Sequence, residues 1–571
     1  MTSAWEQLPV IQAETAVLSL LAEQGELWAG GAGGVACLAG DAWDVRIADL
    51  AVRSVMAFAR QDGFLFVAGF GGVARSHNNG LSWRTGVMPK EDDIATALAI
   101  SPQFAENGTM LAGTLDSGML RSADSGLTWT SASFGMGAVE ITTLRWISGE
   151  IVLAGTPEGL FRSTNGGRAW RRCADLGERP IADAVIRADG TIVVVAMTGE
   201  IAISEDAGAR WRLFDGGMPE DVEVNALSAL ESGALLLGTS GHGLWRSDTG
   251  ETWSLVADNP VLALAVDGLR AFAGTDRGLI RSDDGGLTWE AMAPPPVHDL
   301  RRIDVVAGVP VVTGIGTTPV RQDDSGQWIE IPAFPRPLSW LGAGWGDSLL
   351  ASTPEGLFQS ADLGESWKVV IEGEAGWITA LTILAPGEGW AARADGSSLM
   401  KTKDAGASWE QLASPFGVAP LVALQALPEG AFRHSTLLAA TYDVRQHLLT
   451  VWRSDDGGVN WRADGRAQTE WPGVSMLPDP PTLTMGNLVA VYQGEGAWDR
   501  SVVAGTGVRR IVRENGELIA LSTSGIWRKS GSEWIGLHDD LAMDRVMDIA
   551  LVRGQLLCLL AGGVVKRREM A

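Results

Sequence analysis

The octapeptide Ser122-Ala-Asp-Ser-Gly-Leu-Thr-Trp129 decides the fold, because near copies of it recur along the chain. Ser282 to Trp289 and Ser360 to Trp367 fit the same pattern, S-x-D-x-G-x-[ST]-W. The Asp side chain can accept hydrogen bonds from backbone amides of a tight turn, and glycine readily adopts positive φ. We therefore expect a structural turn held by these residues: Ser122, Asp124, Gly126, Trp129, Ser282, Asp284, Gly286, Trp289, Ser360, Asp362, Gly364 and Trp367.

Weaker copies keep the tryptophan and lose part of the polar pattern, and they extend the repeat over nearly the whole chain. Most steps between successive tryptophans span 36 to 46 residues. The step from Trp461 to Trp534 is close to two repeats, and Trp498 near its midpoint marks a degenerate copy. The repeated tryptophans are residues 43, 83, 129, 170, 211, 253, 289, 328, 367, 409, 461 and 534.

Short apolar runs precede each copy, and glycine or polar turns separate them. Ile141 to Trp146, Ile151 to Thr156 and Gly159 to Ser163 form one such series before the turn that ends at Trp170. Four short strands in a repeat of about 40 residues are typical of a β-propeller blade. We expect an all-β chain of four-stranded blades, in which each tryptophan packs between neighbouring sheets.

The two chain ends look complementary. Residues 546–568 offer three strands without a final tryptophan turn, and Ala4 to Leu8 resembles an isolated fourth strand with Trp5. Pairing these ends would remove two open sheet edges. We predict fourteen blades in two tandem seven-bladed propellers: 1–256 completed by 543–571, so that the terminal strands close the first ring, and 257–542. Six plus eight blades, or one ten-bladed ring with extra elements, are the alternatives.

The charge and composition of the chain exclude some classes of partner. The net charge of −25 repels phosphate backbones and anionic membrane surfaces, so we expect neither nucleic acid nor membrane as a partner. The amino-terminal segment has no basic region, and no apolar stretch is long enough to span a bilayer, which predicts a cytoplasmic protein. The widely spaced Cys37, Cys173 and Cys558 argue against a disulfide framework.

The repeated motif resembles the BNR or Asp-box repeats of sialidases, sortilin-type receptors, photosystem II assembly factors and xyloglucan-degrading glycoside hydrolases. The resemblance covers nearly the whole chain, and its architecture is most similar to xyloglucanases with two tandem seven-bladed propellers. Such a scaffold hosts unrelated activities. Sialidases are known for a tyrosine nucleophile and an F/Y-R-I-P motif, and this chain has no such motif and only two tyrosines, Tyr442 and Tyr492.

The xyloglucanase resemblance implies an inverting hydrolase, which needs two carboxyl groups about 6.5 to 9.5 Å apart. In a propeller the turns between the second and third strands of a blade share one face with the connections between blades. Acids in those places are the catalytic candidates. They are Asp116, Glu158, Asp276, Glu355 and Asp443 in the turns, with Glu91, Asp92, Asp93, Glu220 and Asp221 in the connections.

Other chemistry has less support in the sequence. The six histidines are scattered without a zinc-binding motif, and no phosphate-binding loop or nucleophile elbow occurs, so we expect no metal and no cofactor. Most of the turns are short, and exposed turn carboxylates usually serve only solvation. We therefore expect a non-enzymatic cytoplasmic scaffold that binds a protein partner or other ligand on its loop face or between its rings. The candidate contacts are His242, Asp276, Arg277, Tyr442 and His447. A glycoside hydrolase acting on a β-glucan or xyloglucan is the alternative.

Overall fold

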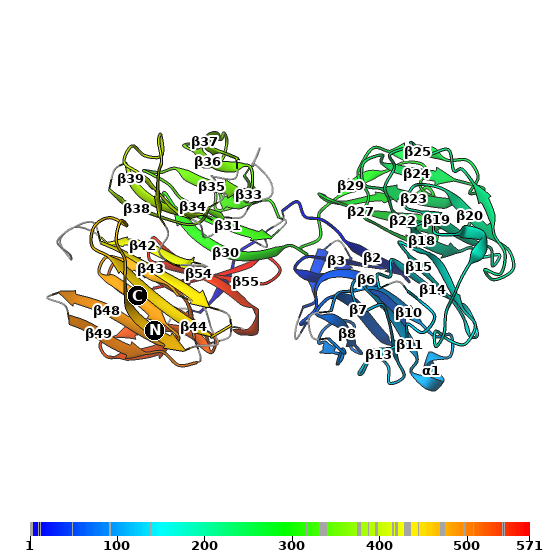
Figure 1. Ribbon diagram of the computed structural model, residues 1–571, viewed down its shortest axis with the longest axis horizontal. Helices are drawn as coiled ribbons and strands as arrows, with labels where there is room; N and C mark the ends of the chain where they lie inside the picture. Colours follow the sequence, from blue (N-terminus) through cyan, green and yellow to red (C-terminus); the bar gives the residue numbers. More distant parts are fainter. Residues whose placement is uncertain are drawn as a thin grey trace. The chain divides into compact units, whose positions relative to one another are not determined.

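The structure is a computed structural model, and its strands form fourteen four-stranded antiparallel sheets among the described residues (Figure 1). It describes residues 4–9, 11, 13–40, 42–47, 50–90, 93–137, 139–315, 317–331, 338, 340–373, 378–385, 387–393, 398–413, 416, 421–427, 436–443, 445–468, 474–494, 497–505, 507–539, 541 and 543–570. The predicted all-β propeller fold is confirmed. In the described part of the chain, helix is confined to short segments, which include α1 (Phe104–Asn107), η1 (Ala174–Leu176) and η3 (Met543–Arg545).

The chain divides into two compact units. The N-terminal unit is Gln12–Asp299, and the C-terminal unit combines Met1–Ile11 with Leu300–Ala571. Each unit contains seven of the four-stranded sheets formed by the described residues.

The blades of the N-terminal unit are, in chain order, β2 (Ser19–Glu23), β3 (Glu26–Gly31), β4 (Gly34–Ala39) and β5 (Ala42–Val45); β6 (Arg53–Gln61), β7 (Phe64–Phe70), β8 (Gly72–Ser76) and β9 (Arg84–Thr85); β10 (Ala95–Ile100), β11 (Met110–Thr114), β12 (Met119–Ser122) and β13 (Thr130–Ser131); β14 (Thr143–Ser148), β15 (Ile151–Thr156), β16 (Gly159–Ser163) and β17 (Arg171–Arg172); β18 (Ile181–Ile186), β19 (Ile192–Ala196), β20 (Ile201–Ser204) and β21 (Arg212–Phe214); β22 (Val224–Ala229), β23 (Leu235–Thr239), β24 (Leu244–Ser247) and β25 (Ser254–Ala257); β26 (Ala263–Asp267), β27 (Arg270–Thr275), β28 (Gly278–Ser282) and β29 (Glu290–Met292).

The blades of the C-terminal unit are β30 (Asp299–Val306), β31 (Val309–Ile315), β32 (Val320–Gln322) and β33 (Trp328–Glu330); β34 (Trp340–Ala343), β35 (Leu349–Thr353), β36 (Gly356–Ser360) and β37 (Lys368–Glu372); β38 (Ile378–Ala385), β39 (Glu388–Arg393), β40 (Ser398–Thr402) and β41 (Glu410–Ala413); β42 (Leu421–Leu427), β43 (Thr436–Asp443), β44 (Leu448–Ser454) and β45 (Arg462–Gln468); β46 (Met476–Pro478), β47 (Pro481–Met485), β48 (Leu488–Gly494) and β49 (Ala497–Val502); β50 (Val508–Glu514), β51 (Glu517–Ser522), β52 (Gly525–Ser530) and β53 (Glu533–Gly536); and β54 (Val546–Val552), β55 (Gln555–Leu560) and β56 (Val564–Glu569) with β1 (Glu6–Gln7).

The N-terminal unit closes on itself without the chain ends. The first strand of each blade contacts the first strand of the next blade, and β26 of the seventh blade contacts β2 of the first. The amide of Val17 donates to the carbonyl of Thr275 at 3.0 Å, and the indole N–H of Trp43 donates to the carbonyl of Ala293 at 3.1 Å. The blade containing Trp289 therefore belongs to this unit.

The chain ends complete a blade of the C-terminal unit. β1 pairs antiparallel with β56, with Glu6 opposite Arg567, and β54 contacts both β50 and β31. A carboxylate oxygen of Asp548 accepts the amide of Ile303 at 3.1 Å, which joins this composite blade to the next one. The terminal pairing occurs, but the division differs from the predicted 1–256 with 543–571 and 257–542. The repeated tryptophans are too alike to indicate which blades meet where a ring closes.

The octapeptide turns have the expected geometry. The Ser122 hydroxyl donates to Asp124 at 2.8 Å and accepts the amide of Gly126 at 2.9 Å, while Asp124 accepts the amide of Thr128 at 2.9 Å. The equivalent turn from Ser282 to Trp289 has the same hydrogen bonds. The bonds that the Thr288 hydroxyl and amide donate to Asp284, together with the bond from Ser282, lower the pKa of Asp284 far below its usual range. The hairpin is therefore fixed by an ionised carboxylate.

The tryptophans pack between neighbouring sheets. Trp129 is buried in one cluster with Phe66 and Val73 of the preceding blade and Leu120 of its own. Some indole N–H groups also bond to the preceding blade, as when Trp83 donates to the carbonyl of Arg46 at 2.7 Å. The repeated indole thus joins successive blades through apolar burial and, at several positions, a hydrogen bond.

Candidate functional site

A buried threonine shapes several turns between the second and third strands of the blades. Thr156, which is fully buried, lies opposite Gly159, donates to its carbonyl at 2.8 Å and accepts the amide of Glu158 at 3.1 Å. Thr275 holds the amide of Arg277 in the same way at 3.1 Å. The threonine satisfies the turn's polar groups internally, so the intervening side chains project outward.

The structure places the catalytic candidates in different surroundings. Asp116, Glu158, Asp276 and Glu355 are exposed turn residues, and Asp443 is the half-buried last residue of β43. Of the candidates in connections, Glu220 and Asp221 are exposed, and Glu91 and Asp92 lie outside the described residues. Asp93 is only 1% exposed, and neither carboxylate oxygen has a hydrogen-bond partner among the described residues. Its burial removes Asp93 from the residues that a polymeric substrate can reach.

The connection between the third and fourth blades brings two candidate carboxylates to the same place. The amide of Gly118, in the turn that carries Asp116, donates to the carbonyl of Val139 at 2.8 Å. On the other side of this connection, a Cβ atom added to Gly137 would lie 3.8 Å from Oε2 of Glu158. Asp116 and Glu158 therefore flank one short segment, 134–139, of which residues 134–137 and 139 are described.

Both carboxylates are open to solvent and have a basic neighbour. The Asp116 side chain is 64% exposed and lies 3.9 Å from Nζ of Lys90. The Glu158 side chain is 53% exposed and lies 3.8 Å from the guanidinium of Arg172, which also pairs with Glu178 at 2.9 Å. These long contacts leave carboxylate oxygens available to a ligand.

The predicted ligand contacts are divided between the two units. In the N-terminal unit, Nε2 of His242 lies 3.2 Å from Asp221, and Nε of Arg277 lies 3.9 Å from Glu14. In the C-terminal unit, the hydroxyl of Tyr442 lies 3.3 Å from Nδ1 of His447.

Asp276 is exposed in the turn beside Arg277, and no hydrogen bond or ion pair between described residues links it to His242. Whether these five residues bind a ligand remains a prediction.

An axial pocket of about 210 Å³ in the N-terminal unit is lined by the first strands of its blades. Arg145 and Thr143 donate to one oxygen of Asp183 at 2.8 and 2.7 Å, and the amide of Leu227 donates to the other at 2.9 Å. The Asp183 oxygens are thus used to tie neighbouring blades. These residues carry no motif, so the sequence does not predict this arrangement.

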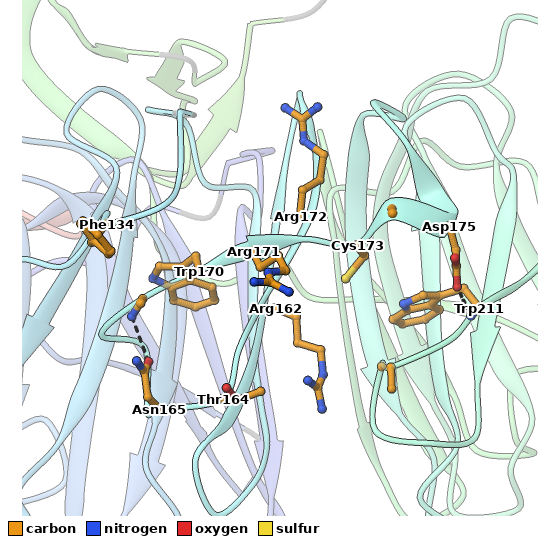
Figure 2. A pocket seen from close by; sticks show the side chains of 14 residues that line it. Phe134, Arg162, Thr164, Asn165, Trp170, Arg171, Arg172, Cys173, Asp175 and Trp211 are labelled. Atoms are coloured by element: carbon orange, nitrogen blue, oxygen red, sulfur yellow. Dashed lines mark hydrogen bonds between the residues drawn. The ribbon is translucent and has the colours of Figure 1, made fainter.

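A second pocket, of about 720 Å³, lies on the N-terminal unit beside β17 (Figure 2). Its lining includes Arg162, Arg171, Trp170, Trp211 and the exposed Phe134. The amide of Trp170 donates to the carbonyl of Phe134 at 2.9 Å, so the segment beside Glu158 also borders this pocket. The only signal in the sequence was the pair Arg171-Arg172 after the repeated tryptophan.

Within the described part of the chain, no three His, Cys, Asp or Glu side chains are grouped so as to hold a metal ion. No helix formed by the described residues has the length and apolar character needed to cross a membrane.

Comparison with known proteins identifies the fold. No protein-family model and no curated protein matches the sequence. Among solved structures, a GH74 xyloglucanase from Xanthomonas campestris is similar over all of both chains, with a TM-score of 0.74 and 18% identity. A GH74 enzyme from Niastella koreensis has a TM-score of 0.71 and 14% identity over 98% of this chain and 99% of its own. PorZ, a surface component of the type-IX secretion system of Porphyromonas gingivalis, has a TM-score of 0.56 and 13% identity, covering 98% of this chain and 86% of its own.

These likenesses correct the functional expectation. At such identities they establish the propeller fold alone, but two neighbours that match nearly end to end with TM-scores above 0.7 are GH74 proteins, and one is named a xyloglucanase. That finding favours the glycoside hydrolase over the non-enzymatic scaffold expected from the sequence. The expectation of a scaffold rests on the short turns, which these structural neighbours do not bear on.

Proposed function

We propose that this chain is a glycoside hydrolase acting on a β-glucan or xyloglucan-type polysaccharide, and that its repeats belong to the BNR or Asp-box group. The observation that carries the proposal is the end-to-end likeness to a GH74 xyloglucanase, with a TM-score of 0.74 over the whole of both chains. The exposed carboxylates beside segment 134–139 supply residues for the chemistry.

The candidate catalytic pair is Asp116 and Glu158. An inverting hydrolase uses one carboxylic acid to protonate the departing glycosidic oxygen and one carboxylate to deprotonate the attacking water. The proton given to the leaving group and the proton taken from water balance over the reaction. Both side chains are exposed, both lie on the loop face, and the short segment 134–139 separates them. A sugar chain can therefore reach both groups.

The basic neighbours hold both candidate carboxylates only loosely. Arg172 already pairs with Glu178, so it offers Glu158 only the longer contact of 3.8 Å. Lys90 is itself largely exposed, and water screens its attraction to Asp116 at 3.9 Å. Neither cation holds its carboxylate in a tight pair, so both carboxylates are free to contact a substrate.

The test is the release of new reducing ends from xyloglucan, mixed-linkage β-glucan and carboxymethyl cellulose by the full chain. We expect turnover of at least one polymer, and a loss of about 10²- to 10⁴-fold in kcat for Asp116→Asn and for Glu158→Gln. Asp276→Asn and Glu355→Gln are matched controls, because these acids occupy equivalent turns in other blades.

Two results would count against the proposal. Release of reducing ends no greater than in an enzyme-free blank on every polymer would exclude the hydrolase. Full activity in both Asp116→Asn and Glu158→Gln would exclude this pair, and loss in a control instead would relocate the site.

A further inference from the structure

The pocket beside β17 has a surplus of positive charge in a strongly acidic protein. Three arginines line it, Arg162, Arg171 and Arg172, and the chain as a whole carries a net charge of −25. Figure 2 shows the side chains of Arg162 and Arg171 between Trp170 and Trp211, with Arg172 directed away from them. The two central arginines therefore decide what the pocket attracts.

The protein leaves these two guanidinium groups without an acidic partner. Arg162 donates its Nε–H to the carbonyl of Ala207 at 2.9 Å and has no ion pair among the described residues. Arg171 is exposed and forms neither an ion pair nor a side-chain hydrogen bond within the described part of the chain. Arg172, by contrast, pairs with Glu178 at 2.9 Å. Planar N–H donors in a concave site favour a carboxylate or another planar oxyanion.

The residues that line the pocket bring little negative charge of their own that would compete with that anion. Among the described residues that line the pocket, Asp175 is the only acidic one. One of its oxygens accepts the amide of Trp211 at 3.2 Å, which fixes the carboxylate against the backbone. An incoming carboxylate can therefore occupy the space before Arg162 and Arg171.

The pocket also has an apolar rim that suits a flat, uncharged body. Phe134 is 80% exposed, although its backbone is held by the hydrogen bond from Trp170. An exposed ring on a fixed backbone is ready to pack against the C–H face of a sugar ring. The net charge of −25 repels a long, highly charged polyanion, which favours a short ligand that carries few carboxylates.

We propose that this pocket binds a uronate, a sugar unit bearing a carboxylate, within the polysaccharide. The inference rests on the proposed hydrolase function and deepens it by naming an acidic substituent of the substrate. Segment 134–139 supplies the connection, because it borders the pocket at Phe134 and the candidate carboxylates at Gly137 and Val139. One sugar chain can then contact Phe134 with its ring and Arg162 and Arg171 with its carboxylate.

The test is calorimetric titration of the full chain with trigalacturonate, with xylotriose as a neutral sugar and triglutamate as a non-sugar polycarboxylate. We expect saturable binding of trigalacturonate, and binding of the other two at least about tenfold weaker. Arg171→Gln and Phe134→Ala should each weaken trigalacturonate binding, the arginine substitution by at least about tenfold.

Arg162→Gln has a matched control. Arg246 donates its Nε–H to the carbonyl of Gly285 at 2.9 Å, which is the same bond between blades that Arg162 makes to Ala207. Arg246→Gln removes that bond outside the pocket and should leave trigalacturonate binding unchanged, while Arg162→Gln weakens it. Equal weakening by both substitutions would show that only blade geometry matters and would overturn the proposal.

The remaining outcomes separate this inference from the hydrolase itself. No binding of trigalacturonate, or equally tight binding of triglutamate or xylotriose, overturns the uronate site even if neutral polymers are hydrolysed. Arg171-dependent binding of trigalacturonate by a chain that hydrolyses no polymer supports the uronate site and refutes the hydrolase.

Discussion

Trp5 donates its indole N–H to the backbone carbonyl of Leu537 at 3.0 Å, so residues 532 positions apart meet at one junction between blades. The indole also packs against the apolar cluster that contains Ile549 and Leu556. Trp5 thus occupies, in the composite blade, the place that Trp129 occupies within a continuous repeat. The C-terminal unit depends on the extreme amino terminus for its last strand.

Trp5→Ala should destabilise the C-terminal unit by about 3 to 5 kcal/mol, because it removes a large side chain from between two sheets. Trp5→Phe, which retains an aromatic ring but loses the N–H donor, should cost less. Hydrogen exchange provides the measurement: protection should fall in β50–β56 and stay unchanged in β2–β29. Loss of protection in β2–β5 instead would contradict the division into units.

Asp124→Ala should destabilise the N-terminal unit by about 1 to 2 kcal/mol in urea titrations, because the amides of Leu127 and Thr128 lose their acceptor. Asp124→Asn is the matched variant and should cost less, since Asn165 already accepts the amides of an equivalent turn through its side-chain oxygen. Equal losses for the alanine and asparagine variants would show that these hydrogen bonds contribute nothing.

The same carboxylate predicts an acid-sensitive contribution. Burial acts to raise the pKa of Asp124, but hydrogen bonds from Thr128 and Ser122 outweigh burial and lower it. A folded pKa below the unfolded value of about 3.9 means that the stabilisation is present above that pH and lost as the pH falls toward the folded pKa. Asp124→Asn should reduce the dependence of unfolding free energy on pH below about 4.

His298 predicts a second pH dependence. The side chain is 1% exposed, neither ring nitrogen has a hydrogen-bond partner among the described residues, and burial lowers its pKa to about 4. Because the unfolded histidine titrates near 6.5, the unfolded state binds the proton first as the pH falls. Stability should fall by about 3 kcal/mol between pH 6.5 and 4.

His298→Leu should remove that pH dependence and preserve stability at neutral pH, and His77→Leu, at an exposed position, serves as the control. Thermal unfolding across this pH range gives the measurement. An unchanged slope in His298→Leu would show that His298 does not titrate as its burial requires.

Arg510→Leu should destabilise the C-terminal unit by about 3 to 5 kcal/mol, because Asp548 would lose the cation beside it and Asp304 would keep only Arg302. Burial raises the pKa of Asp548, while the pKa of Asp304 is lowered because attraction to Arg510 and Arg302 outweighs burial. Asp548→Asn in the Arg510→Leu background should recover part of the loss in urea titrations. No recovery would mean that the buried charge of Asp548 is not the cause.

The sequence alone determined the four-stranded blade, its octapeptide turn and the tryptophan that packs between blades. The octapeptide turn depends on hydrogen bonds within a few residues, as between Asp124 and Thr128, and the repeated tryptophan marks each blade by its period. Trp5 and the unfinished final repeat also predicted that the chain ends would pair, because an orphan strand needs a sheet edge. These features are local or periodic, so a linear pattern expresses them.

Only the tertiary structure decided where each ring closes and which side chains meet. Asp548 reaches the amide of Ile303 across 245 residues, and segment 134–139 lies between Asp116 and Glu158 while bordering the pocket of Arg162 and Arg171. Such contacts depend on which sheet edges pack together, and similar blades offer almost identical edges. The place where each ring closes and the grouping of the site residues therefore follow from long-range packing, which the repeat itself does not encode.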